Sequence, residues 1–180
     1  ELYGQDEVMM ILPAKKDLQS STRAMNMVIS EKLNKGQRDK KSNDNTFRIM
    51  DKVIQRKNDY KGKQVMNGEI GYVTDISNYT LTAKFTNHDE QVMYYNGDLD
   101  ELELAYAITI HLCQGSQYKQ VIVLLDMTHK KWLSNQLLYT AMTRAIKCGV
   151  LVCHPDAFNL SLTTSLNNRM TFLRGLNTLL

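Results

Sequence analysis

The chain has 180 residues, of which 43% are hydrophobic and 23% charged, and its formal net charge is +3. These values fit one globular domain, or one domain with a small insert, and they allow a nucleic-acid partner without requiring one. No apolar run approaches the ~20 residues needed to span a bilayer, and the opening residues do not form a signal peptide. We therefore expect a cytoplasmic protein without membrane contact. Because no Met starts it, we also expect a piece of a longer protein.

The spacing of cysteine and histidine argues against a metal site. The three cysteines are odd in number and show no CxxC spacing, and the four histidines are scattered. A disulfide framework is built from an even set of cysteines, and a zinc site needs closely spaced ligands. We expect neither, and we expect a reducing compartment.

Three continuous apolar runs, at residues 8–12, 121–125 and 150–153, predict strands buried on both faces, as in a parallel sheet. Helices are predicted between and after them, over about 134–147 and 164–176. Strands that alternate with helices indicate a three-layer α/β domain.

Capping residues and loop composition set the ends of the helices. Ser20 or Ser21 can begin a helix that continues to about residue 33, and Ser134 can begin the second helix. Gly149 is expected to end that second helix before the last strand. Residues 35–45 are polar and charged throughout, which predicts a mobile loop.

The middle of the chain has a different period. Residues 69–76, 79–86 and 91–95 alternate apolar and polar side chains, with short turns between them. This pattern predicts an antiparallel meander over residues 67–97 that is too small to be stable alone. We expect it to curl into a small barrel and to lean on the α/β domain.

Polar residues follow an apolar run in the segment 107–118, where a strand is expected to give way to a helix. The polar members of this segment are Thr109, His111, Gln114, Gly115 and Gln117. Read alone, the pattern is also that of a strand–helix junction with Gly115 as a cap and His111 as a hydrogen-bonded core residue. The pattern by itself leaves both interpretations open.

A second polar group lies on the predicted helix 134–147. Gln136, Thr140, Arg144 and Lys147 fall on one ridge opposite the apolar stripe. Read alone, this ridge is typical of a surface helix with one arginine among ordinary polar residues.

Together, the strings Thr-Ile-His-Leu-Cys-Gln-Gly-Ser-Gln and Leu-Tyr-Thr-Ala-Met-Thr-Arg-Ala resemble the last two motifs of superfamily-1 helicases, in the RecD-like version. The resemblance extends in order over nearly the whole chain, from residues 11–34 through 48–71 to the closing segment 168–173. It implies a RecA-like parallel sheet with flanking helices, formed by residues 1–66 and 98–180, and an inserted antiparallel SH3-like β-barrel at 67–97.

The resemblance also assigns roles to residues. Arg144 would be the arginine finger, which reaches the γ-phosphate of ATP held by a neighbouring lobe, a task suited to a permanently charged planar guanidinium. Thr109 and His111 would face DNA. The residues that would face the nucleotide are Gln114, Gly115 and Gln117. This chain departs from the family pattern in having Leu112 and Cys113 where Lys-Ser is usual, and Gln117 where Glu is usual.

Cations gather around Tyr60, among them Arg56 and Lys57. Cations that track phosphates and an aromatic ring that stacks on bases fit single-stranded DNA binding. Lysines placed on an edge strand for solubility give the same pattern. Both interpretations stay open.

The function implied by the resemblance is that of the C-terminal motor portion of an ATP-dependent DNA helicase that translocates 5′ to 3′ on single-stranded DNA. ATP and Mg²⁺ would be bound mainly by the N-terminal ATPase lobe of the same parent chain, because no G-x-x-x-x-G-K-[ST] motif occurs here. We therefore expect this chain alone to be inactive. The alternative is a non-catalytic nucleic-acid-binding or adaptor module of a recombination or conjugation complex, which the departures at Leu112, Cys113 and Gln117 favour.

Overall fold

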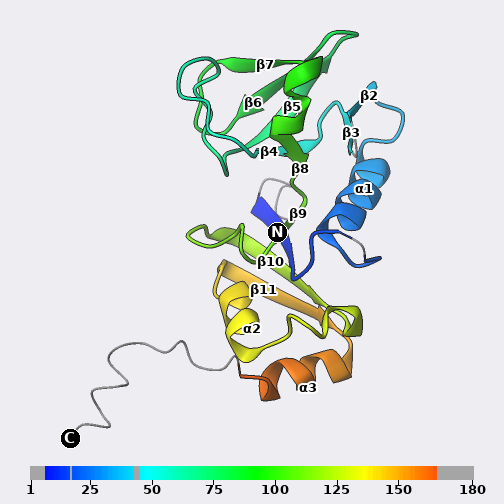
Figure 1. The fold of residues 1–180 in the computed structure, drawn as a ribbon, viewed down its shortest axis with the longest axis vertical. Coiled ribbons are helices and arrows are strands. Elements are labelled where there is room, and N and C mark those ends of the chain that lie inside the picture. The colour runs from blue at the N-terminus through cyan, green and yellow to red at the C-terminus, as the bar shows by residue number, and fades with distance from the viewer. Residues whose placement is uncertain (1–6, 17, 43–44, 166–180) are drawn as a thin grey trace, which may run out of the picture.

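The computed structural model describes residues 7–16, 18–42 and 45–165. Figure 1 shows two parts stacked along the long axis, a β-rich part at the top and an α/β part at the bottom, with helix α1 and strand β9 between them. In the described ranges, no helix is long and apolar enough to cross a membrane.

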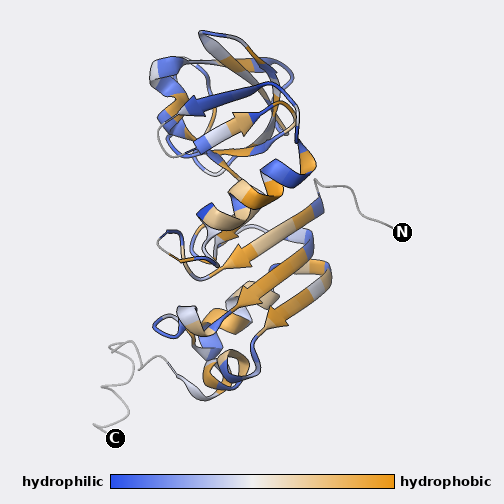
Figure 2. Cartoon of the chain, turned by 90° about the vertical axis from the view of Figure 1, so that its right-hand side faces the viewer, coloured by the Kyte–Doolittle hydropathy of each residue, from blue (hydrophilic) through white to orange (hydrophobic). Residues whose placement is uncertain are grey.

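The α/β part is built on a four-stranded sheet of order β11-β10-β1-β9, in which every pairing is parallel. Its strands are β1 (Val8–Leu12), β9 (Ala107–Thr109), β10 (Tyr118–Leu125) and β11 (Ala145–Cys153). The three strands predicted from the apolar runs are present, but the predicted burial on both faces is wrong for β11, in which no residue is fully buried. Figure 2 shows their hydrophobic colouring, which reflects the continuous apolar runs of a parallel sheet.

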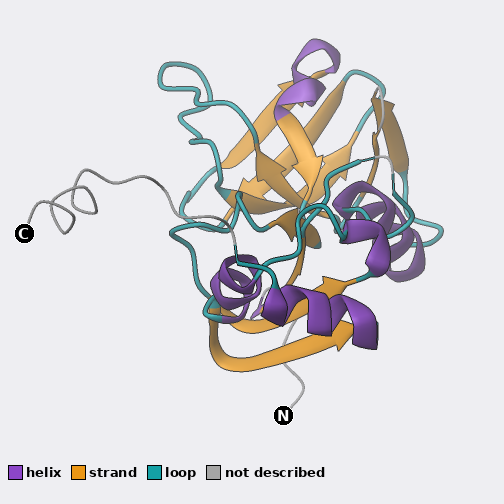
Figure 3. Cartoon of the chain, turned by 60° about the horizontal axis from the view of Figure 1, so that its bottom comes forward, coloured by secondary structure: helices purple, strands orange, loops and turns teal. Residues whose placement is uncertain are grey.

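Two helices cover one face of this sheet. They are α2 (Asn135–Met142) and α3 (Pro155–Thr163), and both lie over the sheet in Figure 3. Leu138, Ala141 and Ala157 pack from the helices onto a core that includes Met9 and Val121. Ser134 caps α2 as predicted, because its side chain accepts a hydrogen bond from the Leu137 N–H.

The prediction that the second helix continues to residue 147 is wrong. Thr143 is the C-cap of α2, and β11 starts at Ala145 because the backbone there pairs with Tyr118 of β10. Arg144 therefore lies between helix and strand. Lys147 lies in the strand, so the predicted helical ridge does not exist.

Gly149 also has a different place from the one predicted. It lies inside β11 rather than at the end of the helix. A Cβ atom there would stand 3.0 Å from the Met142 Cε, the flexible end of a side chain of α2.

The third helix was not predicted where it occurs. α3 begins after His154, whose side chain accepts from the Asp156 N–H, and it has proline in its first turn. Of the helix predicted over 164–176, Thr164 and Ser165 are not helical, and residues 166–176 lie outside the described residues.

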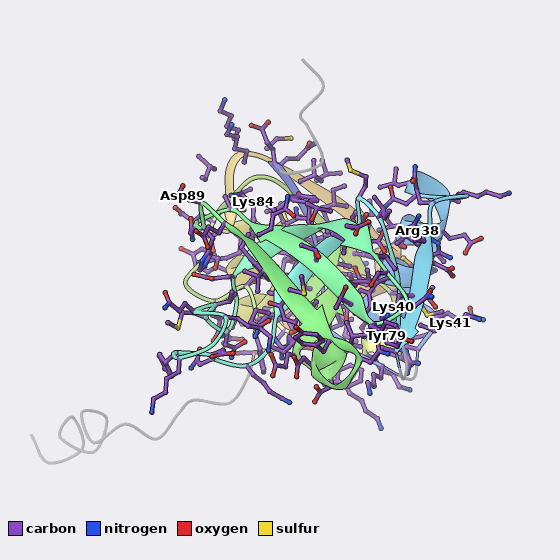
Figure 4. All side chains as sticks on the ribbon, turned by 90° about the horizontal axis from the view of Figure 1, so that it is seen from above. Arg38, Lys40, Lys41, Tyr79, Lys84 and Asp89 are labelled. Carbon is purple, nitrogen blue, oxygen red and sulfur yellow. The ribbon has the colours of Figure 1, made fainter. Side chains whose placement is uncertain are left out.

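Helix α1 (Thr22–Leu33) begins as predicted, with Ser21 as its N-cap. The mobile loop predicted over 35–45 is wrong, because β2 (Asp39–Ser42) and β3 (Asn45–Arg48) form an antiparallel hairpin there. Two contacts explain the order. Phe47 of β3 is fully buried, and the Lys40 ammonium donates to the carbonyl oxygens of Ser77 and Asn78, beside Tyr79 (Figure 4).

The β-rich part is a five-stranded antiparallel sheet of order β7-β6-β5-β4-β8. The predicted meander is present as β5 (Ile70–Ile76), β6 (Thr80–Phe85) and β7 (Gln91–Tyr95). The sheet reaches beyond residues 67–97 on both sides, because β4 (Lys52–Gln55) pairs with β5 and also with β8 (Leu102–Leu104). A short 3-10 helix, η2 (Asn96–Glu101), joins β7 to β8. We refer to residues 45–104 as the β-domain; its core includes Phe47, Phe85 and Tyr94.

A buried carboxylate joins the two parts. Asp51, fully buried before β4, accepts hydrogen bonds from Ser30 of α1 and from Asn34, the C-cap of α1. It also accepts from the Tyr106 hydroxyl between β8 and β9 and from the Arg48 N–H. Burial raises the pKa of Asp51, and these hydrogen bonds oppose the rise. The carboxylate therefore connects the β-domain, α1 and the segment around Tyr106 that leads into β9 of the parallel sheet.

A second connection comes from Asn26 of α1. Its amide nitrogen donates to the carbonyl oxygens of Leu104 and Ala107, and its oxygen accepts from the Ala107 N–H. One side chain thus fixes the end of β8 and the start of β9.

We expect Asp51→Asn to lower the free energy of unfolding by about 1–3 kcal/mol. Whichever oxygen is replaced, the new NH₂ would face an N–H donor that cannot accept, either the Asn34 Nδ2 or the Arg48 backbone N–H. A raised carboxyl pKa stabilises the folded protein below the unfolded pKa of about 3.9, and this stabilisation is lost as the pH rises through the folded pKa. The free energy of unfolding of the wild type, measured by urea denaturation, should therefore exceed that of the variant by more near pH 4 than at neutral pH. Asp75→Asn, at a carboxylate 63% exposed, is the control. A difference that grows as the pH rises would contradict this account.

Candidate functional site

The two motif segments lie side by side in the structure. The Tyr118 N–H donates to the Arg144 carbonyl oxygen at 2.9 Å, and Tyr118 and Ala145 are register partners in the parallel pairing of β10 and β11. The Arg144 Nη1 donates to the Ser116 carbonyl oxygen at 3.3 Å. Sheet pairing thus places the only arginine of the second motif against the loop that carries the first.

That loop, which we call the 109–117 turn, makes a single helical turn and no helix. The N–H groups of Leu112 and Cys113 both donate to the Thr109 carbonyl oxygen. Gly115 has φ +85°, a backbone conformation that side chains with a Cβ rarely adopt, and nothing lies within 4 Å of where its Cβ would be. The predicted passage from strand to helix is therefore wrong, because the chain turns back at once to enter β10.

The polar residues of this turn face solvent. His111, Gln114, Gly115 and Gln117 are exposed, and Thr109 is half-buried. The interpretation of His111 as a core residue is therefore wrong. The exposed backbone and side chains near Gly115 are accessible to an external ligand.

The two residues that depart from the family pattern point inward. Cys113 is fully buried, and its Sγ lies 3.0 Å from the Ile110 carbonyl oxygen, to which it donates. Burial raises the pKa of the Cys113 thiol, and the positive charge of Arg144 opposes this rise. Leu112 packs against the core of the α/β part. Both residues thus contribute to packing below the exposed turn.

The Arg144 side chain is held by neutral groups. Its Nε donates to the Thr140 carbonyl oxygen at 3.1 Å, and its Nη2 to the Thr143 hydroxyl at 3.3 Å. It is half-buried, and within residues 7–16, 18–42 and 45–165 no carboxylate forms an ion pair with it. A guanidinium oriented by carbonyl oxygens keeps its full charge for an anion.

The cations near Tyr60 form a separate group. The Arg56 Nε lies 3.3 Å from Glu103, and the Lys57 ammonium 2.6 Å from Asp100. The Lys57 hydrogen bond holds the pKa of the Asp100 carboxyl below its usual value. Tyr60 is 68% exposed. The structure thus pairs Arg56 and Lys57 with carboxylates of η2 and β8, and it does not bring them to Arg144.

Sequence reasoning did not single out a cleft between the start of α1 and the β-domain. This cleft of about 220 Å³ is lined by Lys15, Lys16 and Arg23 on one side and by residues of η2 and β8 on the other. Lys15 forms an ion pair with Glu103 at 2.7 Å. A smaller neighbouring cavity with several of the same lining residues reaches Thr109. The sequence feature that could have revealed this cleft is the pair Lys15-Lys16, which comes shortly after β1. Ligands often bind at the carboxyl ends of parallel strands.

In the described ranges, no group of three or more His, Cys, Asp or Glu side chains could hold a metal ion. What the site can do chemically is bind anions, through Arg144 at one edge of the sheet and through the basic side of the cleft at the other.

Comparisons with known proteins match both parts of the chain. Residues 25–95 match the model for the SH3 domain of ATP-dependent RecD-like DNA helicases, and residues 104–152 match the model for the UvrD-like helicase C-terminal domain. The chain is 34% identical to the ATP-dependent RecD2 DNA helicase of Deinococcus radiodurans over 146 residues, which are 81% of this chain and 20% of that protein. It is 39% identical to the RecBCD enzyme subunit RecD of Mycobacterium tuberculosis over 89 residues, 49% of this chain and 15% of that protein.

Solved structures show the same fold. A Bacteroides Pif1 helicase in complex with ADP-AlF3 and single-stranded DNA has a TM-score of 0.64 at 19% identity, over 96% of this chain and 46% of that one. The Candida albicans Pif1 helicase has a TM-score of 0.57 at 16% identity, over 88% and 50%.

The parallel sheet with its helices matches the UvrD-like helicase C-terminal domain, and the β-domain matches the SH3 domain of RecD-like helicases. More particularly, the chain is homologous to RecD2 and to the RecD subunits. It spans about a fifth of the length of its RecD2 relative.

We expect Gly115→Ala to cost about 1–2 kcal/mol of unfolding free energy relative to Gly97→Ala, because only position 115 requires a left-handed backbone. In both places a Cβ would meet nothing within 4 Å, so the comparison isolates the backbone conformation. Chemical denaturation of the two variants measures the difference. Equal stability of the two variants would contradict the strained turn.

Proposed function

We propose that this chain is the C-terminal motor portion of an ATP-dependent DNA helicase that moves 5′ to 3′ on single-stranded DNA, with Arg144 as its arginine finger. The observation that carries the proposal is the guanidinium of Arg144, held by the carbonyl oxygens of Thr140 and Ser116 without a described carboxylate partner. A planar fork of donors with a permanent charge suits phosphate oxygens. Homology to RecD2 and RecD supports the motor assignment.

The nucleotide side of the proposal rests on the 109–117 turn. Gln114, Gly115 and Gln117 are exposed next to the Arg144 contact at Ser116, so a phosphate that reaches Arg144 also meets this turn. ATP and Mg²⁺ would be held mainly by the N-terminal ATPase lobe, because this sequence lacks the phosphate-binding motif. Bound Mg²⁺ would supply charge neutralisation to the phosphates, and Arg144 of this chain would add its guanidinium.

The DNA side of the proposal lies near the cleft. Thr109 is the last residue of β9 and lines the smaller cavity next to the cleft that Lys15, Lys16 and Arg23 line. His111 is exposed two residues later. Cations next to hydroxyl groups suit the phosphates of single-stranded DNA.

The Tyr60 group would extend this DNA path. Tyr60 is exposed enough to stack on a base. Arg56 and Lys57 contribute only if a DNA phosphate replaces their carboxylate partners, Glu103 and Asp100.

The alternative is a binding or adaptor module without catalysis. The sequence departures that favour it most are Leu112 and Cys113. Both side chains pack into the core, so these departures do not change the exposed surface of the 109–117 turn. Loss of the carboxylate at Gln117 still favours it.

In the full-length parent, we expect Arg144→Ala to lower DNA-stimulated ATP turnover by about 10³-fold or more, the usual effect of an arginine finger. Single-stranded DNA binding should stay within a factor of about two, because this residue faces the nucleotide and phosphate contacts on DNA lie elsewhere. Steady-state ATPase assays and fluorescence anisotropy measure the two effects. Arg38→Ala, at a 65% exposed arginine directly before β2, is the matched control. Unchanged turnover in Arg144→Ala would favour the binding module.

The isolated 180-residue chain should show no ATP turnover above background, because it has no phosphate-binding loop of its own. Phosphate release with and without single-stranded DNA measures this. If the isolated chain hydrolyses ATP and Arg144→Ala abolishes that turnover, the proposal that a separate lobe must bind the ATP is contradicted.

A further inference from the structure

The segment that follows β10, residues 126–133, carries the only tryptophan of the chain. Trp132 is 44% exposed, and Lys130 and Lys131 directly before it are exposed as well. Among the residues that the structure describes, no carboxylate forms an ion pair with either lysine. This segment, which we call the 126–133 loop, therefore presents an indole ring and two ammonium groups to solvent.

A buried histidine holds the 126–133 loop in place. The Nδ1 of the fully buried His129 accepts from the Asp126 N–H at 3.1 Å, so its Nε2 donates to the Ser20 carbonyl oxygen at 2.8 Å. The hydroxyl groups of Ser20 and Thr128 form a second contact at 3.0 Å. Because Ser20 lies between β1 and α1, the loop is fixed against the segment that connects these two elements.

Both segments lie at the edge of the sheet where its parallel strands end. Since β1 pairs with β9 on one side and with β10 on the other, the residues that follow these three strands are neighbours. Thr109 ends β9, Lys15 and Lys16 come after β1, and the 126–133 loop comes after β10. Figure 1 shows the segments after β1 and β10 on the same side of the molecule. Parallel sheets bind their ligands at this carboxyl edge.

We propose that Trp132 stacks on a base of single-stranded DNA and that Lys130 and Lys131 contact the adjoining phosphates. The inference rests on the proposed function, because it extends the DNA side of the site from Thr109 and the cleft across β1 to the end of β10. An aromatic ring stacks on the face of any base, so this contact supports binding without sequence preference. Lysines beside the ring add the attraction for the backbone.

The 126–133 loop differs from the Tyr60 group in the state of its cations. Arg56 and Lys57 are paired with carboxylates of η2 and β8, which DNA would first have to displace. In the described part of the chain, the two lysines beside Trp132 have no such carboxylate to lose. Phosphates can therefore approach the loop without breaking an ion pair.

The fluorescence of the single tryptophan reports the contact directly in the 180-residue chain. We expect an oligothymidylate of about 12 nucleotides to quench the Trp132 fluorescence strongly at low salt, because a base would stack on the indole. Heparin, a polyanion without bases, should bind the lysines and leave the fluorescence largely unchanged. Equal quenching by heparin and by the oligothymidylate would overturn the proposal, since charge alone would then account for the signal.

Substitution of the ring measures how much the stacking contributes. Trp132→Ala should weaken binding of a labelled oligothymidylate about tenfold, the usual effect of losing one stacked base, as measured by fluorescence anisotropy. Trp132→Phe should recover most of the affinity, because it keeps an aromatic face. Tyr79→Ala, at a 76% exposed tyrosine of the β5–β6 turn, is the matched control and should leave the affinity unchanged. Equal affinities of the wild type and Trp132→Ala would overturn the proposal.

The salt dependence of binding tests the two lysines. Each phosphate contact on a single strand contributes about 0.7 to the slope of log affinity against log salt. The double variant Lys130→Gln/Lys131→Gln should therefore reduce the size of this slope by about 1.4. Lys32→Gln/Lys35→Gln, at two exposed lysines near the end of α1, should leave the slope unchanged. Equal reductions in the two double variants would show an effect of net charge only and would overturn the proposal.

Failure of this inference is distinguishable from failure of the proposed function. If binding of the oligothymidylate is weakened by Lys15→Ala but not by Trp132→Ala, the DNA side of the cleft stands and the 126–133 loop does not contact DNA. If the chain binds no oligothymidylate at low salt, the loop proposal is overturned as well. The turnover of Arg144→Ala in the full-length parent tests the motor assignment independently of both results.

Discussion

The parallel pairing of β10 with β11 determines the geometry of the candidate site. Because Tyr118 and Ala145 are register partners, Arg144 and the end of the 109–117 turn lie at the edge of the sheet where both strands begin. The backbone bond from Tyr118 to Arg144 holds them there, and the guanidinium then needs only carbonyl and hydroxyl oxygens to keep its orientation. A buried carboxylate would fix an arginine more tightly, but it would also neutralise the charge that a phosphate needs.

The junction between the two parts is formed by buried polar groups. Asp51 and Asn26 connect α1, the β-domain and the entry to β9 through buried hydrogen bonds. A small antiparallel unit of this size gains little stability alone, so its contacts with α1 hold it in place. Since the cleft that includes Lys15 and Arg23 lies between α1 and η2–β8, the same junction sets the shape of that cleft.

Several elements were predictable because the physics that forms them is local. Continuous apolar runs identified β1, β10 and most of β11, and strict alternation identified the meander β5–β7. The end of α2 was not predictable, because residues 143–147 continue a helical pattern and only the pairing of β11 with β10 overrides it. The hairpin β2–β3 was missed because one buried residue, Phe47, and a distant contact of Lys40 order an otherwise polar segment.

In the candidate site, too, local motifs were predictable and contacts between distant residues were not. The residues of both motifs were recognisable, and the structure brings Arg144 to the 109–117 turn. The carboxylate partners of Arg56 and Lys57 stand more than 40 positions away in sequence, so no local pattern reveals that these cations are paired. The basic side of the cleft likewise depends on how α1 lies against η2 and β8.

Arg144 is proposed to reach a phosphate held by another lobe of the parent protein. The most direct measurement is a structure of the full-length parent with a nonhydrolysable or transition-state analogue of ATP, Mg²⁺ and single-stranded DNA. The account predicts that the Arg144 guanidinium leaves the Ser116 carbonyl oxygen and donates hydrogen bonds to the group in the γ-phosphate position. A guanidinium that stays on Ser116 while a different side chain contacts that group would contradict it.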